Sequence, residues 1–203
     1  KVSTGPLSSS TRFYDGDTPD ISYDPEKAKD LLEESSYDGE TIRILGLPYG
    51  ETWQRWAEAV KQNLSEIGMK SEIVPSDVAG WNQKVADRDF DLAFTYLYQY
   101  GDPALGVSRT YMGDNAAPGS PWNNVANYQN PETDKLFAEA ALMASPEERK
   151  AAYKEIQDAI VEDVPNIWLL ELGFPTIYRC DVKNPVNTAF GVNDGFRDVW
   201  LDK

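Results

Sequence analysis

The sequence contains no histidine, and this absence excludes several kinds of site. A Ser-His-Asp or Cys-His nucleophile and an imidazole metal ligand all need that side chain. The single cysteine, Cys180, has no second cysteine with which to form an internal disulfide, which fits a reducing compartment and equally fits an exported protein without disulfides. Carboxylate chemistry stays open, because acidic residues are plentiful.

Basic residues are also scarce, since 19 Lys and Arg stand against 34 Asp and Glu, a formal net charge of −15 over 203 residues. This excess repels phosphate backbones and anionic lipid headgroups, so we expect no nucleic-acid partner. No apolar run reaches the length of about 18 residues that a membrane span needs, so we expect no direct membrane insertion of this segment. The chain opens at Lys1 without a signal-peptide core, and we expect it to be part of something longer.

What the chain does have is a generous aromatic supply, with 41% hydrophobic and 12% aromatic residues. That composition is too apolar for a disordered chain and predicts a globular core. Residues 24–26, 130–132 and 145–147 each place a capping side chain, a proline and a glutamate in this order, which predicts three helix starts. Apolar residues at helical spacing follow each start, among them Leu31 and Leu32, and predict buried helix faces.

Strands and helices alternate in the middle of the chain. Residues 41–47 and 70–74 read as strands flanking a helix that Gly68 ends, and a short helix at 78–86 and a strand at 90–98 extend this βαβ unit. The pattern predicts an α/β fold with a mainly parallel sheet flanked by helices. Further strands are expected at 167–172, 174–178 and 196–201.

Ligands of parallel sheets bind beyond the carboxyl ends of the strands, which draws attention to the segment after residue 95. Tyr96, Tyr98 and Tyr100 would share one face of a strand and Gln99 the other. Aromatic faces with hydroxyl groups suit sugar rings and peptide side chains, but a strand end packed under a loop explains the same residues. Asp102 precedes Pro103 and reads as turn chemistry.

Several motifs in a fixed order resemble one protein family. They are YDPEKAKDLLEE at 23–34, the helix at 53–68, residues 73–81, FDL at 90–92, Asp102-Pro103 and YQNPETDKL at 128–136. From Tyr23 to Lys203 the chain resembles the C-terminal lobe of family 5 extracellular solute-binding proteins, which deliver oligopeptides, dipeptides, nickel chelates and some oligosaccharides to ABC importers.

The resemblance implies a periplasmic-binding-protein type II-like lobe, in a periplasmic or cell-surface receptor that binds a small molecule or peptide and docks on ABC importer permease subunits. It implies no cofactor, no metal, no catalytic residue and no enzymatic activity. Residues 1–180 would form the second lobe, incomplete at its N-terminal side, and residues 181–203 would return to a first lobe outside this chain.

The resemblance also implies the ligand contacts: Trp81, Tyr96, Tyr98, Gln99, Tyr100, Asp102, Trp122 and Asn124. Trp81 has a second interpretation as a helix core residue, and Trp122 and Asn124 lie in a loop that would overhang the cleft. Peptide-binding members carry an aspartate at the position of Gln99, where it pairs with the α-ammonium of the ligand. We therefore hypothesise that Gln99 excludes ligands that need an ammonium partner.

Two alternatives stay open at this point. The first is an oligosaccharide receptor of the same family. The second is a carboxylate-dependent glycoside hydrolase, which needs two carboxyl groups about 5–10 Å apart, one of them with a raised pKa. Only Asp102 lies in the predicted cleft, so the receptor is the favoured reading.

Overall fold

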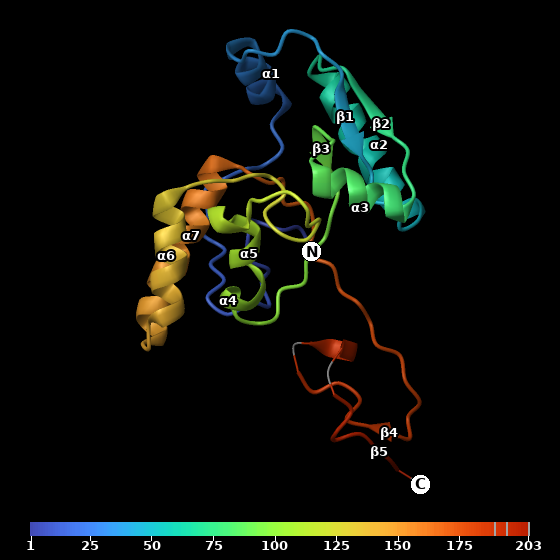
Figure 1. The fold of residues 1–203 in the computed structure, drawn as a ribbon, viewed down its shortest axis with the longest axis vertical. Helices are drawn as coiled ribbons and strands as arrows, with labels where there is room; N and C mark the ends of the chain where they lie inside the picture. Colours follow the sequence, from blue (N-terminus) through green and yellow to red (C-terminus); the bar gives the residue numbers. More distant parts are fainter. Residues whose placement is uncertain (189, 194, 203) are drawn as a thin grey trace. The chain divides into compact units, whose positions relative to one another are not determined.

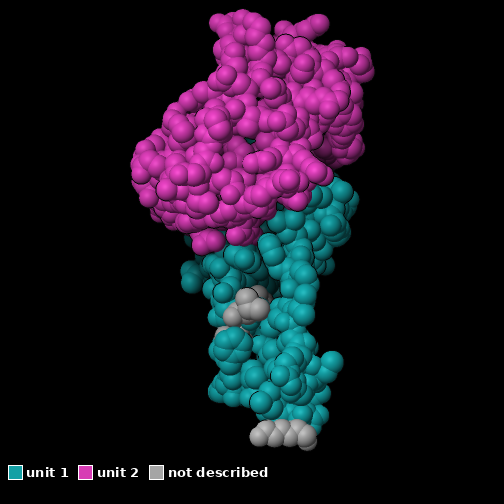
Figure 2. Space-filling model, turned by 90° about the vertical axis from the view of Figure 1, so that its right-hand side faces the viewer, with its two compact units in different colours: residues 1–19, 98–108, 135–203 teal, residues 20–97, 109–134 magenta. Residues whose placement is uncertain are grey.

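The computed structural model describes residues 1–188, 190–193 and 195–202, and it consists of two compact units (Figure 1, Figure 2). Unit 1 contains residues 1–19, 98–108 and the chain from 135 onward. Unit 2 contains residues 20–97 and 109–134. In the part of the chain that is described, no helix is both long and apolar enough to cross a bilayer.

Unit 2 is built on a parallel three-stranded sheet in the order β2-β1-β3. Its elements in chain order are β1 (Ile42–Leu45), α2 (Glu51–Glu66), β2 (Ser71–Val74), α3 (Val78–Asp87) and β3 (Leu92–Ala93). In the register, Ile44 lies opposite Ile73 of β2 and Leu92 of β3. The predicted βαβ unit and parallel sheet are therefore confirmed.

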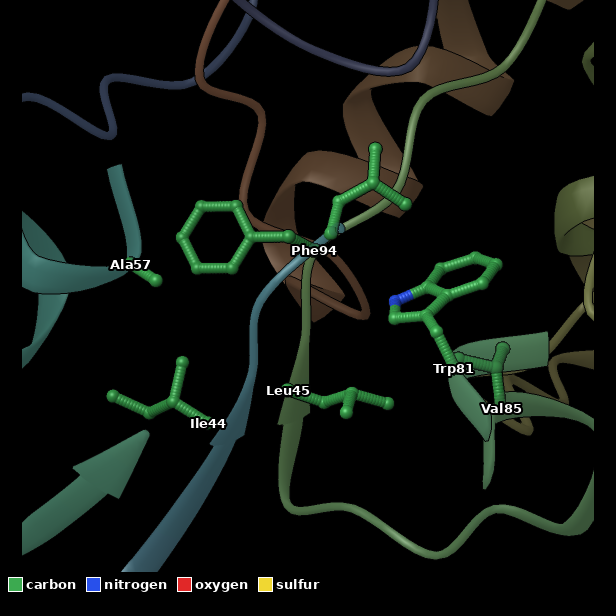
Figure 3. Close-up of a cluster of buried hydrophobic side chains, with 7 residues drawn as sticks. Ile44, Leu45, Ala57, Trp81, Val85 and Phe94 are labelled. Atoms are coloured by element: carbon green, nitrogen blue, oxygen red, sulfur yellow. The ribbon is translucent and has the colours of Figure 1, made fainter. Parts of the chain in front are cut away.

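The core of unit 2 lies on both faces of β1. Ile44 and Leu45 are adjacent in sequence and both buried, which requires cover on each side of the strand. Figure 3 shows Ile44 on the side of Ala57 from α2, and Leu45 on the side of Trp81 and Val85 from α3. The central strand is thus packed on both faces.

The helix α1 (Pro25–Glu34) also belongs to unit 2, and it begins where the sequence predicts. Asp24 caps it by accepting a hydrogen bond from the backbone N–H of Lys27 at 3.0 Å. The expected buried face is wrong, because no residue of α1 is buried and Leu31 is 56% exposed. Periodicity shows which side of a helix is apolar but does not show whether anything covers that side.

The helical part of unit 1 contains α4 (Pro103–Gly106), most of α6 (Pro131–Leu142) and α7 (Pro146–Asp163). The short α5 (Ser108–Tyr111) and η1 (Gly113–Asn115) follow α4 in the chain. Phe137 of α6 packs edge-on against Tyr153 of α7, with ring centroids 6.3 Å apart, and both rings are buried. The Oγ of Ser145 accepts from the N–H of Glu148 at 3.3 Å and caps α7 as predicted.

Of the three strands predicted in unit 1, two are absent and the third is shorter than expected. Residues 167–178 form no strand, only an isolated antiparallel bridge between Val2 and Leu170, because no sheet among the described residues pairs with this apolar run. The late strand is only β5 (Trp200–Leu201), which pairs with β4 (Val182–Lys183) beyond a turn that includes η2 (Gly191–Asn193).

The strand predicted at 90–98 shrinks to β3 in the structure. The N–H of Phe94 still donates to the oxygen of Leu45 at 2.9 Å, but β1 ends at Leu45 and the chain turns away through Pro48. A strand cannot continue without a partner. The expectation that Tyr96, Tyr98 and Tyr100 share one strand face is therefore wrong.

Candidate functional site

An aromatic cluster lies at the carboxyl ends of the parallel strands of unit 2. Tyr49 follows β1, Tyr96 follows β3, and Trp53 and Trp56 belong to the first turns of α2. The ring centroids of Tyr96 lie 6.2 Å from Tyr49 and 5.6 Å from Trp53, and Trp53 lies 4.7 Å from Trp56. These separations are those of favourable aromatic pairs. Tyr49 is 42% exposed and Tyr96 and Trp53 are partly exposed, so the cluster presents ring surface to solvent.

A tryptophan pair forms a second aromatic feature of unit 2. Trp81 and Trp122 lie with ring centroids 5.5 Å apart and planes inclined by 41°. Trp81 has no exposed surface and belongs to the core cluster of Figure 3, in agreement with its alternative interpretation as a core residue. Trp122 is partly exposed. Of this pair, Trp122 is the member that keeps exposed surface.

Asn124 is 1% exposed and is fully engaged by its own loop. Its Nδ2 donates to the carbonyl oxygens of Met112 and Tyr128, and its Oδ1 accepts from the N–H of Tyr128. The buried amide therefore links the backbone at Met112 to the backbone at Tyr128 within unit 2.

In unit 1, the segment 98–102 carries a row of stacked rings. Tyr98 and Tyr100 stack at 6.2 Å, Tyr98 lies 6.0 Å from Phe174, and Tyr100 stacks on Phe190 at 5.0 Å. Tyr98 is 43% exposed and Tyr100 is partly exposed. The two tyrosines thus remain together and keep accessible surface, although they do not lie on a strand.

Gln99 differs from its tyrosine neighbours, because its side chain is bound by the N-terminal segment of the chain. Its Oε1 accepts from the N–H of Ser8 at 2.8 Å and from the hydroxyl of Thr11 at 2.7 Å, and its Nε2 donates to the oxygen of Pro6 at 2.8 Å. A side-chain amide can both accept and donate, and here it does both within unit 1. Gln99 thus connects the segment 98–102 to residues 6–11 through three hydrogen bonds.

Asp102 is also bound within unit 1. Its Oδ1 accepts from the N–H of Ala104 and caps α4, which agrees with the predicted turn chemistry. Arg149 holds both carboxylate oxygens, at 3.0 and 2.9 Å. Partial burial alone would raise the pKa of Asp102, but the hydrogen bonds from Arg149 and from the Ala104 N–H outweigh it, and the pKa lies below its ordinary value. An ionised, paired carboxylate of this kind is unsuited to general-acid catalysis, which needs a raised pKa.

The eight predicted contacts are distributed over both units. Unit 2 holds Trp81, Tyr96, Trp122 and Asn124, and unit 1 holds Tyr98, Gln99, Tyr100 and Asp102. Tyr49 and Trp53 are not among the predicted contacts, although the rule that ligands bind beyond the carboxyl ends of parallel strands applies to β1 as well as to β3. Among the described residues, no group of three or more Cys, Asp or Glu side chains is arranged to hold a metal ion.

Comparisons with known proteins agree with this architecture. The sequence model of the bacterial extracellular solute-binding proteins, family 5 (middle region), matches residues 1–119. Heme-binding protein A of Haemophilus influenzae is 29% identical over 97% of this chain and 36% of its own length. Peptide transport periplasmic protein SapA of Salmonella typhimurium is 25% identical over 94% of this chain and 35% of its own length.

Solved structures share the fold. The ABC transporter substrate-binding protein CtaP of Listeria monocytogenes aligns with a TM-score of 0.72 and 27% identity, over 80% of this chain and 33% of its own. DppA of Helicobacter pylori, in complex with the peptide STSA, aligns with a TM-score of 0.79 and 22% identity, over 100% of this chain and 39% of its own. These likenesses confirm the predicted α/β, periplasmic-binding-protein type II-like fold.

The chain spans about a third of the length of the curated relatives it matches. The family model covers more than half of the chain, and its match includes the aromatic cluster and the segment 98–102. The chain belongs to family 5 of the bacterial extracellular solute-binding proteins.

Proposed function

We propose that the protein is the substrate-binding component of an ABC importer, which captures a peptide-like or other small solute between two lobes and delivers it to the membrane permease. Membership of family 5 supports this role, and so do the names of relatives that bind heme, dipeptides and glutathione. The observation that carries the proposal is the partly exposed aromatic cluster of Tyr49, Trp53 and Tyr96 at the carboxyl ends of the strands.

The proposal includes the location and the partners of the protein. A periplasmic or cell-surface receptor that docks on permease subunits accords with the periplasmic relative SapA. Residues 1–180 would belong to the second lobe and residues 181–203 would return to the first. Exposed apolar side chains support that return, because Phe196 and Leu201 are 64% and 56% exposed and a further lobe would cover them.

Catalysis is not part of the proposal. A glycoside hydrolase needs a carboxyl group that holds a proton near neutral pH, and the one acid of the segment 98–102 has a lowered pKa and is paired with Arg149. The oligosaccharide receptor stays within the same proposal as a choice of solute, because aromatic rings stack on sugars as well as on peptide side chains.

A thermal-shift screen of the full-length protein against peptide and sugar libraries tests the proposal. We expect a member of one library to raise the melting temperature. We expect Trp53→Ala to weaken the affinity for that ligand about two- to tenfold through loss of ring stacking. Leu142→Ala is the control, because that side chain is 87% exposed at the end of α6. The proposal would be overturned if the ligand were turned over during the assay, or if no compound of either library raised the melting temperature.

The amide at position 99 adds a proposal about selectivity. Because Gln99 brings no charge and its side chain is bound to residues 6–11, the ammonium group of a free dipeptide finds no partner at this position, and we expect such a dipeptide to bind more weakly than its N-acetylated form. Calorimetric titration of the two forms measures this. A preference of more than about tenfold for the free ammonium group, comparable to a charge-assisted hydrogen bond, would contradict the selectivity proposal while leaving the receptor proposal intact.

A further inference from the structure

The loop that carries Trp122 is tied down at several points within unit 2. At its start, the N–H of Gly113 donates to Oδ1 of Asp134 at 2.9 Å. A Cβ at Gly113 would lie 2.8 Å from Oδ2 of the same aspartate, so a larger residue there would require this carboxylate to move. Nearer the tip, the N–H of Gly119 donates to the oxygen of Ala86 on α3 at 3.0 Å. The loop therefore has a fixed course.

The bonds of Asn124 connect the two arms of this loop. Its Nδ2 lies 3.1 Å from the oxygen of Met112 and 2.7 Å from that of Tyr128, and the N–H of Tyr128 lies 2.9 Å from its Oδ1. Two donated bonds and one accepted bond are the pattern of a neutral amide, and a carboxylate could not reproduce it. At 1% exposure, this side chain is unable to reach a solute directly.

Its position in the chain gives Asn124 an indirect role. Trp122 lies two residues earlier, packs on the buried ring of Trp81, and is itself partly exposed. We propose that Asn124 is a positioning residue, which holds Trp122 against Trp81 so that the outer face of Trp122 is presented to the solute. The contact with solute rests on the proposed receptor function, whereas the positioning does not.

The substitution Asn124→Asp tests the positioning without any ligand. At pH 7.5 the carboxylate faces two carbonyl oxygens and loses both donated bonds, whereas below its pKa the protonated acid recovers one donor. The readout is near-UV circular dichroism, taken as the difference between each protein and its Trp122→Phe counterpart, which isolates the coupled Trp81–Trp122 signal. We expect this signal to fall by about half or more at pH 7.5 and to recover partly at pH 4.

Asn123→Asp is the matched control, because it adds the same charge at the neighbouring position and should leave the signal unchanged at both pH values. If Asn124→Asp does not fold, Asn124→Ser, which retains one donor, is measured in its place and should show a smaller loss. An unchanged Trp81–Trp122 signal in a folded Asn124 variant would refute the positioning.

A second arm measures binding of the tripeptide Ala-Ala-Ala and of maltotriose by calorimetry. We expect Asn124→Asp and Trp122→Ala to weaken whichever probe binds the wild type by a similar factor, about two- to tenfold. A lost dichroism signal with unchanged affinity would overturn the link to the solute. If neither probe binds the wild type, that result counts against the proposed receptor function. The positioning of Trp122 by Asn124 is then judged from the dichroism result alone.

Discussion

Replacing Arg149 of α7 by methionine should destabilise unit 1. The guanidinium makes a bidentate pair with Asp102 and donates through Nε to the oxygen of Ala140 at 3.0 Å. It also lies over the rings of Phe13 and Tyr153, at 4.8 and 5.7 Å from their centroids. Methionine retains the aliphatic stem and removes all of the polar contacts.

The expected cost follows from the burial of the pair. The side chains of Arg149 and Asp102 are only 15% and 22% exposed. Breaking a fully buried pair costs about 3–5 kcal/mol, because one charge is left without its partner, and an exposed pair is worth about 0.2–1 kcal/mol. For a pair this deeply placed we expect about 3 kcal/mol, which corresponds to a fall of about 6–12 °C in melting temperature for a chain of this size.

Urea unfolding, together with hydrogen exchange of the amides in α4 and α7, measures the change and assigns it to unit 1. Arg55→Met is the matched control, because its pair with Glu51 is 79% and 83% exposed and should contribute less than about 0.5 kcal/mol. A double-mutant cycle with Asp102→Asn should give a coupling of about 2 kcal/mol. A loss below about 1 kcal/mol, or a coupling near zero, would refute the reasoning.

Three further predictions concern packing, capping and pH. Trp81→Ala removes a fully buried ring and should lower the free energy of unfolding in urea by about 3–5 kcal/mol. Trp122→Ala should lower it by about 1–2 kcal/mol and act mainly on solute affinity. Equal losses in the two variants would contradict the assignment of Trp81 to the core. Ser145→Ala removes the cap of α7 and should cost about 1 kcal/mol by the same assay, with the exposed Ser36→Ala as its control. Because the pKa of Asp102 is lower in the folded than in the unfolded protein, its contribution is present above about pH 5 and is lost as the pH falls through the lowered pKa. Melting temperatures from pH 6 to pH 2 should therefore fall less steeply in Arg149→Met, and parallel curves would contradict this.

Local signals predicted the elements that depend on local chemistry. The helices at 25, 131 and 146 begin where a capping residue, a proline and a glutamate coincide, and the parallel βαβ unit follows from its alternating patterns. The lengths of strands depend on their partners. Residues 94–98 have strand-like sequence, but β1 ends at Leu45 and leaves them nothing to pair with. The run at 167–172 pairs only with the first few residues of the chain, through the single bridge between Val2 and Leu170, and forms no strand.

The candidate site was predictable to a smaller degree. The capping role of Asp102 could be inferred from the following proline, and the exposed rings of Tyr98 and Tyr100 from their type. The role of Gln99 could not, because its partners Ser8 and Thr11 lie 91 and 88 positions away in the sequence and no periodicity reports such a contact. The bonds of Asn124 lie within one loop, but loop geometry of that kind has no sequence rule comparable to a helix cap.

The alternation within residues 98–102 has a consequence for which of these positions can be substituted independently. Tyr98 and Tyr100 offer ring surface, whereas Gln99 and Asp102 are each held by several internal hydrogen bonds. Substitutions at the two tyrosines alter the shape offered to solvent and disturb their ring contacts with Phe174 and Phe190, whereas a change at position 99 or 102 requires a compensating change in residues 6–11 or at Arg149. Under the proposed receptor function, a change of solute at this segment should therefore alter the rings first, with the amide and the acid retained together with their distant partners.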